Sequence, residues 1–411
     1  MRERIIVGCT AIIFGLICFT TGYTLGQSRL APIRIFSGFN AQPSETNDLF
    51  APFWEVWDML HTSYFDQPLN DIALMEGAID GMLAVLGDQH TRYLPPEQQA
   101  HEQESMNGEF QGIGAYVEEV EGSIVIVSPI EGSPAEAAGL QPGDILRQAD
   151  GIDLTGMSAD EAASLVRGPA GTTVILVVER DGTILTLEIM RDLVQVASVR
   201  GEMLDNGIAY VRLSRFGGRT TQELEEMLND LMAQEPTGLI LDLRRNPGGG
   251  LTTVVDVADE FLDEGVVLVE RFGNGEETIY DSDDGGLATT VPMVILVDEG
   301  SASASEVLAG ALRDRGRAIL IGQTTFGKGT VQTWRELSNE GGIRLTIARW
   351  LTPNGIWVNE TPLQPDYFIT LPEATNIAAE GDSQLQAAVD YLLGKEVQSE
   401  PPPVVEPTGE G

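Results

Sequence analysis

The first apolar run of the chain covers residues 5–26 and carries no charged side chain. As a helix, its 22 residues at about 1.5 Å each would span roughly 33 Å, close to the thickness of a bilayer core. Arg2 and Arg4 precede it. We therefore expect an uncleaved signal anchor, favoured over a cleaved signal peptide, with its N-terminus in the cytoplasm.

Two amphipathic segments follow a polar spacer. Residues 49–60 place apolar, mostly aromatic side chains at helical spacing, and residues 71–86 repeat a helical pattern that ends at Gly87. The aromatic stripe is predicted to be part of a packed core rather than a ligand site. This part of the chain is thus predicted to be an N-terminal helical region.

Between residues 108 and 192 short apolar segments alternate with turns. Strands are expected at residues 112–117, 123–127, 173–179 and 184–189, and short helices at residues 134–138 and 158–165. This pattern indicates a small β-rich domain.

Between residues 193 and 395, buried-type strands alternate with amphipathic helices. Strands are expected at residues 208–213, 238–243, 291–297, 318–321 and 343–349, and helices at residues 221–232, 253–262, 306–314 and 384–393. This alternation is typical of an α/β domain whose sheet is covered on both faces. The last residues, 396–411, are rich in proline and glutamate and are predicted to be disordered.

Charge and cysteine content narrow the function classes. The chain has 63 acidic and 24 basic residues, a formal net charge of −39, which argues against nucleic acid or anionic lipid as a partner for most of it. Both cysteines, Cys9 and Cys18, lie in the first apolar run. The rest of the chain therefore has no cysteine nucleophile and no cysteine-ligated metal site. We expect neither a metal nor a cofactor, since no metal-ligand or phosphate-loop spacing is present.

A serine-rich turn and one lysine are conspicuous in the α/β region. Ser301, Ser303 and Ser305 lie between a predicted strand and a predicted helix, a geometry that presents a hydroxyl at a helix N-terminus. Lys328 and Lys395 are the only lysines among the basic residues. A desolvated lysine can lose its proton and act as a base, which arginine cannot. A serine near such a lysine is a known nucleophile–base pair.

The pattern alone leaves alternatives open. It does not choose among the three serines, and Lys328 is equally explained as a turn residue between glycines. Three histidines are alternative bases, although each is interpreted as a capping or surface residue: His61, His90 and His101. Backbone N–H groups at Gly248 and Gly249, just past a predicted strand, are candidate oxyanion donors, and the amide after the nucleophile would be the second.

A glycine pair opens the β-rich region. Gly112, Ile113 and Gly114 let backbone N–H groups approach an anion, and an edge strand beside a helix can accept a peptide as an added strand. Together with residues 133–146, this motif resembles a PDZ domain. The resemblance implies a groove that captures a C-terminal carboxylate on these amides. Arg167 either assists in this capture or is a solvated loop charge.

From residue 49 to residue 393 the chain resembles the bacterial carboxyl-terminal processing, or tail-specific, serine proteases. The order of helical segment, PDZ domain and α/β core matches. The matching motifs are LGD at 86–88 with TRY at 91–93, LDLR at 241–244 with NPGG at 246–249, SASASE at 301–306, and FGKGTVQ at 326–332. The departure is the second arginine of the pair Arg244-Arg245.

This resemblance implies roles for individual residues. It makes Ser303 the nucleophile, Lys328 the general base and Gln332 the residue that orients the lysine. The oxyanion donors it implies are the amides of Gly249 and Ala304. The protease core is expected to have a ClpP/crotonase-like α/β fold.

The predicted domains follow in chain order. They are a cytoplasmic tip (1–4), a transmembrane signal anchor (5–26), a linker (27–47), an N-terminal helical region (48–107), a PDZ domain (108–192), a serine protease core (193–395) and a disordered tail (396–411).

The function implied is a serine endopeptidase that recognises C-terminal tails of extracytoplasmic proteins through its PDZ domain and cleaves near them. It would be anchored in the bacterial cytoplasmic membrane, with its catalytic domains on the periplasmic or cell-wall side. Its expected partners are peptides with apolar C-termini and the membrane; a regulatory adaptor and a homo-oligomer remain open. Two alternatives are a catalytically silent membrane-anchored PDZ scaffold and a Ser-His hydrolase.

Overall fold

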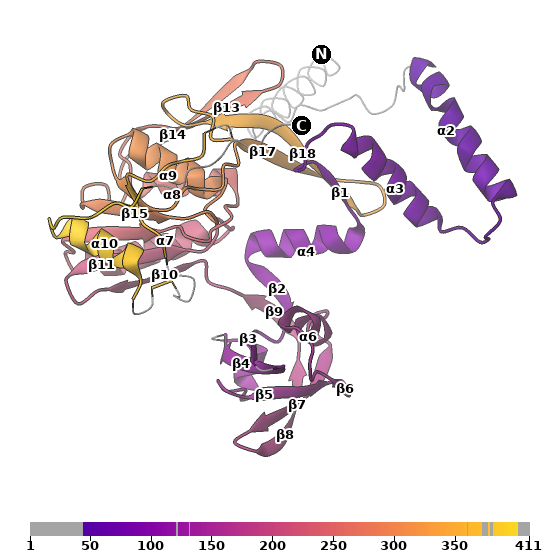
Figure 1. The fold of residues 1–411 in the computed structure, drawn as a ribbon, viewed down its shortest axis with the longest axis horizontal. Coiled ribbons are helices and arrows are strands. Elements are labelled where there is room, and N and C mark those ends of the chain that lie inside the picture. Colours follow the sequence, from indigo (N-terminus) through magenta and orange to yellow (C-terminus); the bar gives the residue numbers. More distant parts are fainter. Residues whose placement is uncertain are drawn as a thin grey trace, which may run out of the picture. The chain divides into compact units, whose positions relative to one another are not determined.

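The computed structural model describes residues 44–120, 122–130, 132–359, 361–371, 377–378 and 381–401 (Figure 1). The chain divides into two compact units, Met1–Ala73 and Leu74–Gly411. The predicted tip, anchor and most of the linker, and the tail beyond residue 401, lie outside the described residues. Within the described ranges, no helix is both long enough and apolar enough to cross a membrane.

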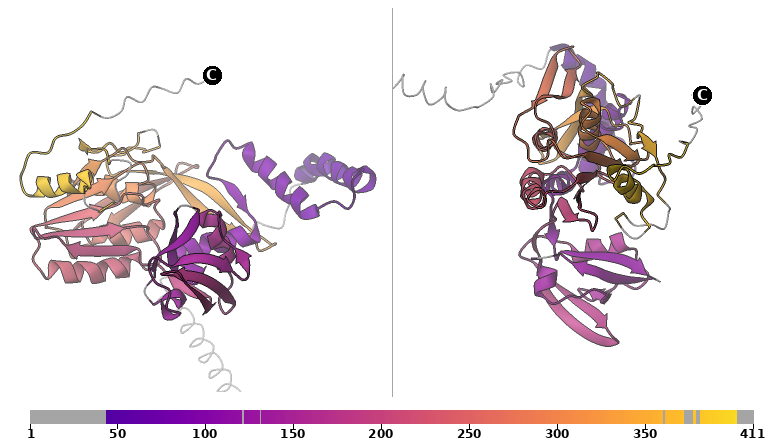
Figure 2. Two further views of the ribbon diagram at one scale, coloured as in Figure 1. Left: turned by 60° about the horizontal axis from the view of Figure 1, so that its bottom comes forward. Right: turned by 90° about the vertical axis from the view of Figure 1, so that its left-hand side faces the viewer.

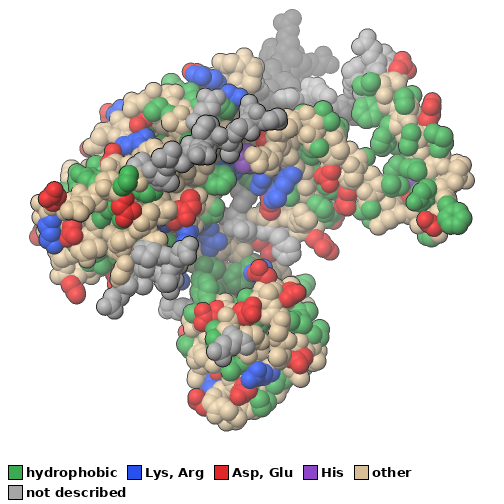
Figure 3. Space-filling view, viewed as in Figure 1, with side chains coloured by type: hydrophobic (Ala, Val, Ile, Leu, Met, Phe, Trp, Pro, Cys, Tyr) green, Lys and Arg blue, Asp and Glu red, His purple; other side chains and the backbone are tan. Residues whose placement is uncertain are grey.

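The first unit contains helix α2 (Ser44–Ser63), and helix α3 (Asp71–Ala84) begins within it. The prediction that its aromatic stripe is packed core is wrong. Trp54 is 58% exposed and Met59 is 57% exposed, and apolar side chains run along the surface of α2 (Figure 3). Phe53, Trp54 and Trp57 contact one another at ring centroid distances of 5.1 to 6.5 Å. Within the described part of this unit, residues 44–73, no second layer covers these rings.

The predicted β-rich domain is confirmed. Its main sheet runs β3-β4-β5-β7-β8 with β6 on β5, and β2 pairs with β9 in a separate ribbon. The strands are β2 (Glu109–Gly112), β3 (Ala115–Val120), β4 (Ser123–Pro129), β5 (Ile145–Ala149), β6 (Ile152–Asp153), β7 (Thr173–Arg180), β8 (Thr183–Met190) and β9 (Asp192–Gln195). The strand expected at 112–117 is interrupted because Gly114 has φ +81°, a conformation that breaks an extended chain.

Two short helices complete this domain. Helix α5 (Pro134–Ala137) begins with a Ser133 cap and proline at its first position, and α6 (Ala159–Val166) begins with a Ser158–Glu161 capping box. On β7, alternate residues are fully buried: Val174, Leu176 and Val178. Period-two burial of this kind is what the sequence pattern predicted.

The α/β core is built on a six-stranded sheet with the strand order β10-β11-β12-β15-β16-β19. All neighbours are parallel except β10 and β11. The strands are β10 (Val199–Met203), β11 (Ile208–Leu213), β12 (Gly238–Asp242), β15 (Met293–Val297), β16 (Ile319–Gly322) and β19 (Tyr367–Phe368). Helices α7 (Thr220–Met232), α8 (Leu251–Asp259), α9 (Ala304–Asp314) and α10 (Ser383–Leu392) cover it.

Alternate residues of each core strand bury against different helices. Ala209, Val211 and Leu213 of β11 join one apolar cluster with α7, α8 and α9. Ile208 and Tyr210 join another with α10. Figure 2 shows α7 and α10 on opposite sides of the sheet. The predicted α/β domain with both sheet faces covered is confirmed.

The sequence pattern did not predict most of a further, five-stranded sheet. It contains β1 (Arg92–Leu94), β18 (Gly342–Leu351), β13 (Gly265–Phe272) and β14 (Glu277–Ser282) in that order, with β17 (Thr330–Glu336) also pairing with β18. Only β18 was expected. In β14 and β17 nearly all residues are partly or fully exposed, so these strands have no apolar face that a sequence pattern could reveal. Helix α4 (Pro96–Asn107), strongly polar, was missed for the same reason.

Candidate active site

Three turns meet at one edge of the core sheet. They follow β12, β15 and β16, which are adjacent and parallel, so their carboxyl ends lie together. In open α/β sheets this edge is where ligands bind. The turns carry Gly248 and Gly249, the three candidate serines, and Lys328.

Ser303 occupies a strained position between β15 and α9. It is the N-cap of α9 with φ 54° and ψ −114°, a positive φ that side chains rarely adopt. Its side chain is half-buried, and its hydroxyl donates to no acceptor in the described part of the chain. The predicted strand, turn and helix are therefore present, and they hold one hydroxyl where it can react.

The neighbouring serines have structural partners. Ser301 donates its hydroxyl to the Leu243 carbonyl at 2.8 Å, and Ser305 donates to the Asn246 carbonyl at 2.9 Å. Both serines are fully buried. These two hydrogen bonds attach the serine turn to the residues that follow β12. They also distinguish Ser301 and Ser305 from Ser303, a distinction that the spacing of the serines in the sequence could not make.

Glu306 joins the serine turn to the lysine loop. This carboxylate is fully buried and accepts four hydrogen bonds, two on each oxygen. One oxygen accepts from the Thr325 hydroxyl at 2.6 Å and the Gly327 N–H at 2.7 Å. The other accepts from the N–H groups of Ser303 and Lys328, each at 2.9 Å. Sequence reasoning gave Glu306 no role, although a glutamate three residues after a serine N-cap is a known signal.

Asp298 is a second buried carboxylate that accepts hydrogen bonds from backbone N–H groups. One of its oxygens accepts from the N–H groups of Arg245 at 2.8 Å and Gly300 at 3.0 Å. Burial raises the pKa of Asp298, and these bonds partly counter that. Arg245, the departure from the family motif, has φ 55° and an exposed side chain. Its backbone is thus part of the frame, while its guanidinium faces outward.

Arg244 lies at the centre of a fully buried polar network. Its guanidinium is 2.6 Å from Asp242 and 2.8 Å from Asp382, and it donates to Gln384 at 2.9 Å. Tyr210 donates to the same oxygen of Asp242 that lies 2.6 Å from Arg244, at 2.7 Å. Burial alone would lower the pKa of Arg244, but the carboxylates outweigh it and raise that pKa. The network ties the start of α10 to the turn that precedes Gly248.

The glycine turn lies directly against the nucleophile candidate. A Cβ on Gly248, which has φ +99°, would come within 2.9 Å of both Ser303 Cβ and the Ala304 nitrogen. A Cβ on Gly249 would meet the Phe216 carbonyl at 2.2 Å. The N–H groups of Gly249 and Ala304 donate to no acceptor in the described residues. Two unpaired donors therefore flank Ser303.

Lys328 lies in a loop whose backbone is fixed. Trp350 donates its indole N–H to the Lys328 carbonyl at 2.9 Å, and Trp357 donates to the Gly329 carbonyl at 2.7 Å. Burial lowers the pKa of Lys328, and the Arg344 charge lowers it further, against the opposing effects of Glu306 and Asp88. Both leading causes favour the neutral amine that a base requires.

The side chains of the predicted dyad are not hydrogen-bonded to each other in the described residues. No hydrogen bond links Ser303 to Lys328, or Lys328 to Gln332, within the described ranges. Gln332 instead donates to the Thr330 hydroxyl at 2.8 Å. The structure thus brings the backbones that carry these residues to one edge of the sheet without a hydrogen bond between their functional groups.

The polar turn at 86–93 also reaches this site. Asp88 accepts from the His90 N–H at 2.9 Å and the Thr91 hydroxyl at 2.6 Å, and Arg344 donates to the His90 carbonyl at 3.0 Å. Burial lowers the pKa of His90, and the nearby Lys328 charge lowers it further. The charges of His90 and Lys328 are therefore close enough to affect each other, although no hydrogen bond joins the two side chains in the described ranges.

The other two candidate histidines are His61 and His101. His61 belongs to the first unit, where its ring lies 2.8 Å from an Asp71 oxygen. His101 is in α4, and its side chain lies outside the described set. Among the described residues, no group of three or more His, Cys, Asp or Glu side chains could hold a metal ion.

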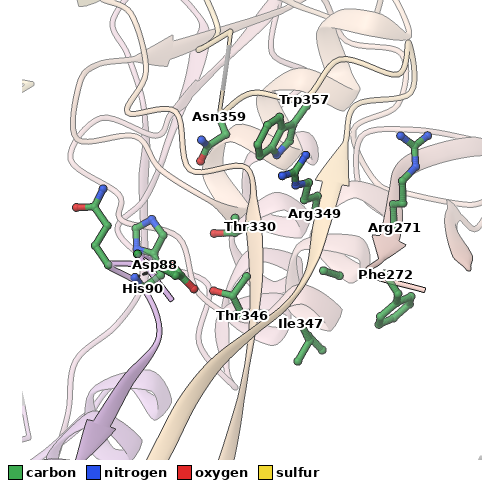
Figure 4. Close-up of a pocket in the computed structure, with 14 residues that line it drawn as sticks. Asp88, His90, Arg271, Phe272, Thr330, Thr346, Ile347, Arg349, Trp357 and Asn359 are labelled. Carbon is green, nitrogen blue, oxygen red and sulfur yellow. Dashed lines mark hydrogen bonds between the residues drawn. The ribbon is translucent and has the colours of Figure 1, made fainter. Parts of the chain in front are cut away.

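Two cavities adjoin the site. One of about 500 Å³ is lined by the glycine turn, Phe216, Trp334 and Arg344. The other, of about 680 Å³, lies beside the Lys328 loop between the 87–90 turn and strands β17 and β18 (Figure 4). Both are large enough to receive side chains of a peptide.

A third cavity, of about 240 Å³, lies in the β-rich domain between β3 and α6. Ile113, Gly114 and Arg167 line it, and Gly112 precedes them at the end of β2. The Arg167 guanidinium lies 5.8 Å from the Phe110 ring centroid. The four predicted peptide-binding residues are therefore at or next to one groove between a strand and a helix.

Comparison with known proteins agrees with this architecture. A model of "Peptidase family S41" matches residues 207–369, and a model of "PDZ domain" matches residues 125–180. The chain is 38% identical to the carboxy-terminal processing protease CtpA of Bacillus subtilis, over 78% of this chain and 68% of that one. It is also 38% identical to a carboxyl-terminal-processing protease of Synechocystis, over 82% and 81%. The solved photosystem II D1 C-terminal processing protease is 32% identical, covers 78% of this chain and 88% of its own, and has a TM-score of 0.48.

Proposed function

Since the chain belongs to the carboxy-terminal processing proteases of peptidase family S41, and is a serine-type peptidase with a PDZ domain, we propose that it uses a Ser303–Lys328 dyad. The observation that carries this proposal is the difference among the three serines. Ser301 and Ser305 donate to buried carbonyls, whereas the Ser303 hydroxyl donates to none in the described part of the chain. The lowered pKa of Lys328 supports its role as the base.

The proposed oxyanion donors are the N–H groups of Gly249 and Ala304. Both lack an acceptor in the described residues and flank Ser303. Donors aimed at the developing oxyanion stabilise the transition state more than the ground state. Loss of one such donor typically costs about 100- to 1000-fold in rate.

The reaction proceeds by acyl transfer. Neutral Lys328 removes the Ser303 proton as the oxygen attacks the scissile carbonyl, and the resulting oxyanion is held by the two amides. The lysine then gives its proton to the leaving amine. Water, deprotonated by the same lysine, hydrolyses the acyl-enzyme and frees Ser303. Since no hydrogen bond joins the two side chains in the described residues, the proposal requires the Lys328 amine to reach the Ser303 hydroxyl when substrate binds, and Gln332 to turn from Thr330 to orient it.

The test uses the full-length chain, purified in detergent, and a peptide with an apolar C-terminus. We expect Ser303→Ala and Lys328→Ala each to abolish cleavage, while Ser301→Ala and Ser305→Ala keep it. Full activity in Lys328→Ala would overturn the assignment of the base. His90→Gln tests the Ser-His alternative, since the charges of His90 and Lys328 are close enough to affect each other; a variant as active as the parent excludes His90 as the base.

The proposed role of the PDZ domain is to select substrates by their C-terminal tail. The groove lined by Ile113, Gly114 and Arg167 supports it. A carboxylate would be held by the backbone amides of residues 112–114, and an apolar side chain would enter the cavity between β3 and α6. Amidating the C-terminus of a peptide should slow its cleavage, and equal rates for acid and amide would remove this domain from substrate selection.

We further propose that residues 5–26 anchor the chain in the cytoplasmic membrane, with the PDZ and protease domains outside the cytoplasm. The uncharged apolar run and the two preceding arginines support this. The domain limits given above, including a PDZ domain at 108–192 and a core at 193–395, are part of the same proposal. A cysteine-accessibility experiment on intact cells, with one cysteine placed at residue 218, would label only if the core is external.

A further inference from the structure

Charged residues on adjacent strands form a row beside the cavity at the Lys328 loop. Arg271 of β13 lies directly opposite Arg349 of β18 in antiparallel register. Glu277 of β14 pairs with Arg271, and Thr330 of β17 pairs with Arg349, so the row crosses four strands. Directly opposed residues have Cβ atoms about 4.5–5.5 Å apart on one face, and like charges so placed are destabilising.

The two arginines are compensated differently. Arg271 donates to Glu277 at 2.6 Å. The Arg349 guanidinium has no hydrogen bond or ion pair within the described ranges; it stacks on Trp357, with 3.9 Å from its central carbon to the ring centroid. Stacking holds a guanidinium in a fixed plane while its N–H groups stay available at the edge. Figure 4 shows Arg349 and Trp357 side by side.

The remaining lining suits an anion. Thr330, Thr346 and Asn359 supply polar groups. Asp88 is the acidic residue of the lining, and its two oxygens already accept from the His90 N–H and the Thr91 hydroxyl. In a chain with a net charge of −39, Arg349 is thus a cation of this lining that has no carboxylate partner in the described ranges, whereas Arg271 is paired with Glu277.

The cavity adjoins the loop that carries the proposed base. Trp357, on which Arg349 stacks, donates its indole N–H to the Gly329 carbonyl at 2.7 Å, and Thr330 is two residues beyond Lys328. We propose that this cavity binds a carboxylate of the peptide substrate, on the Arg349 guanidinium, as a subsite next to the scissile bond. The inference rests on the proposed function, because it requires a peptide to lie along the Lys328 loop.

The experiment measures binding, so it does not depend on cleavage. Fluorescein-labelled alanine-rich peptides with an apolar C-terminus are titrated by anisotropy against full-length Ser303→Ala. One set moves a single aspartate along the peptide and is matched by asparagine. A second set compares a free with an amidated C-terminus. Each set is repeated with Arg349→Gln added, and with Arg335→Gln added as the control, since Arg335 is an exposed arginine of β17 outside the cavity lining.

We expect one aspartate position, or the free C-terminus, to tighten binding about fivefold, as for a half-exposed ion pair. Arg349→Gln should abolish an aspartate preference, or reduce an acid-over-amide preference to the part that the PDZ groove supplies; Arg335→Gln should keep either preference, and added salt should weaken it. Loss of the aspartate preference identifies a side-chain carboxylate, and a reduced acid-over-amide preference identifies the terminal one. The subsite is overturned if Arg349→Gln changes neither preference, or if the parent has no aspartate preference and Arg349→Gln leaves its acid-over-amide preference unchanged. The proposed function fails separately, if the parent with Ser303 cleaves none of these peptides.

Discussion

The two halves of the catalytic edge are built differently. On the Ser303 side, the buried carboxylates of Glu306 and Asp298 accept hydrogen bonds from backbone N–H groups, and the buried Arg244 guanidinium donates to side chains, among them Asp242. On the Lys328 side, the backbone of the loop is fixed, but the lysine and Gln332 side chains make no bond to each other or to Ser303 in the described residues. In the proposed mechanism the nucleophile and the oxyanion donors are therefore preset, and the base is the part that has to move.

This difference has a thermodynamic meaning. Strain at a positive φ persists only where the surroundings determine it, and Ser303 is held by bonds that are all buried. A half-buried lysine without a partner can change rotamer at little cost. Mutations on the first side should therefore affect stability and rate together, whereas those on the second side should affect rate and its pH dependence.

The largest expected effect comes from the serine turn. Ser303→Ala should lower kcat by about 10⁴-fold or more because it removes the nucleophile, and the structural bond it loses is the one that the Ser303 side chain accepts in the capping box of α9. Ser301→Ala and Ser305→Ala should keep kcat but lose stability: each removes one buried hydrogen bond, while the carbonyl keeps a backbone donor, and costs about 0.5–1.5 kcal/mol. Peptide cleavage and thermal unfolding, measured on the same preparations, check this. Equal losses of activity in all three variants would contradict the assignment of Ser303, rather than Ser301 or Ser305, as the nucleophile.

Second in size is the glycine turn. Gly248→Ala places a Cβ 2.9 Å from the Ala304 nitrogen, in the space where the oxyanion would lie, and should lower kcat by about 100- to 1000-fold. Gly218→Ala is the control, since a Cβ there meets nothing within 4 Å and its φ is ordinary. The prediction is contradicted if both variants have the parent's kcat.

The third effect concerns Glu306, whose carboxylate accepts hydrogen bonds from both the serine turn and the Lys328 loop. Glu306→Gln retains one accepting oxygen, so two of the four donors lose their partner, and we expect kcat to fall about 10- to 100-fold with KM little changed. Glu260→Gln is a matched control, because Glu260 is also a buried acid that accepts a backbone N–H, from Leu287. If both variants lose stability but neither loses kcat, Glu306 is purely structural.

The smallest expected effect concerns the base. The cleavage rate should rise with pH as Lys328 loses its proton, with a midpoint below the ordinary lysine pKa, because burial and then Arg344 lower it. Arg344→Gln removes a nearby positive charge, so the pKa of Lys328 should rise and the midpoint of kcat/KM against pH should move to higher pH. Arg335→Gln should leave the midpoint in place. A midpoint unchanged in Arg344→Gln would mean that another group limits the profile.

The difference between the two sides also explains what the sequence could predict. Apolar runs such as 291–297 and 238–243 gave the parallel strands, and the motifs gave the residues that meet at their ends. The exposed strands β14 and β17 carry too few buried positions to be recognised. The choice of Ser303 came from family resemblance, and its physical reason became visible only when Ser301 and Ser305 were seen to donate to β12 and its turn.

Long-range polar partners were beyond the reach of sequence patterns. Glu306 and Thr325 are distant in the chain, and Arg244 and Asp382 are further apart still. A carboxylate in a sequence does not indicate which donors will surround it, because that depends on which strand ends become neighbours. The interaction between the His90 and Lys328 charges was not predicted for the same reason, since nothing local in the sequence connects the two residues.

The pairing of Arg244 with Asp382 has a consequence for biosynthesis. Asp382 caps α10, one of the last elements to be made, whereas Arg244 is synthesised more than a hundred residues earlier. Until α10 emerges, the guanidinium beside the glycine turn has only Asp242 as its carboxylate, and the sheet face under α10 is uncovered. A nascent chain would therefore complete its proteolytic apparatus only near the end of translation, which protects its neighbours during synthesis.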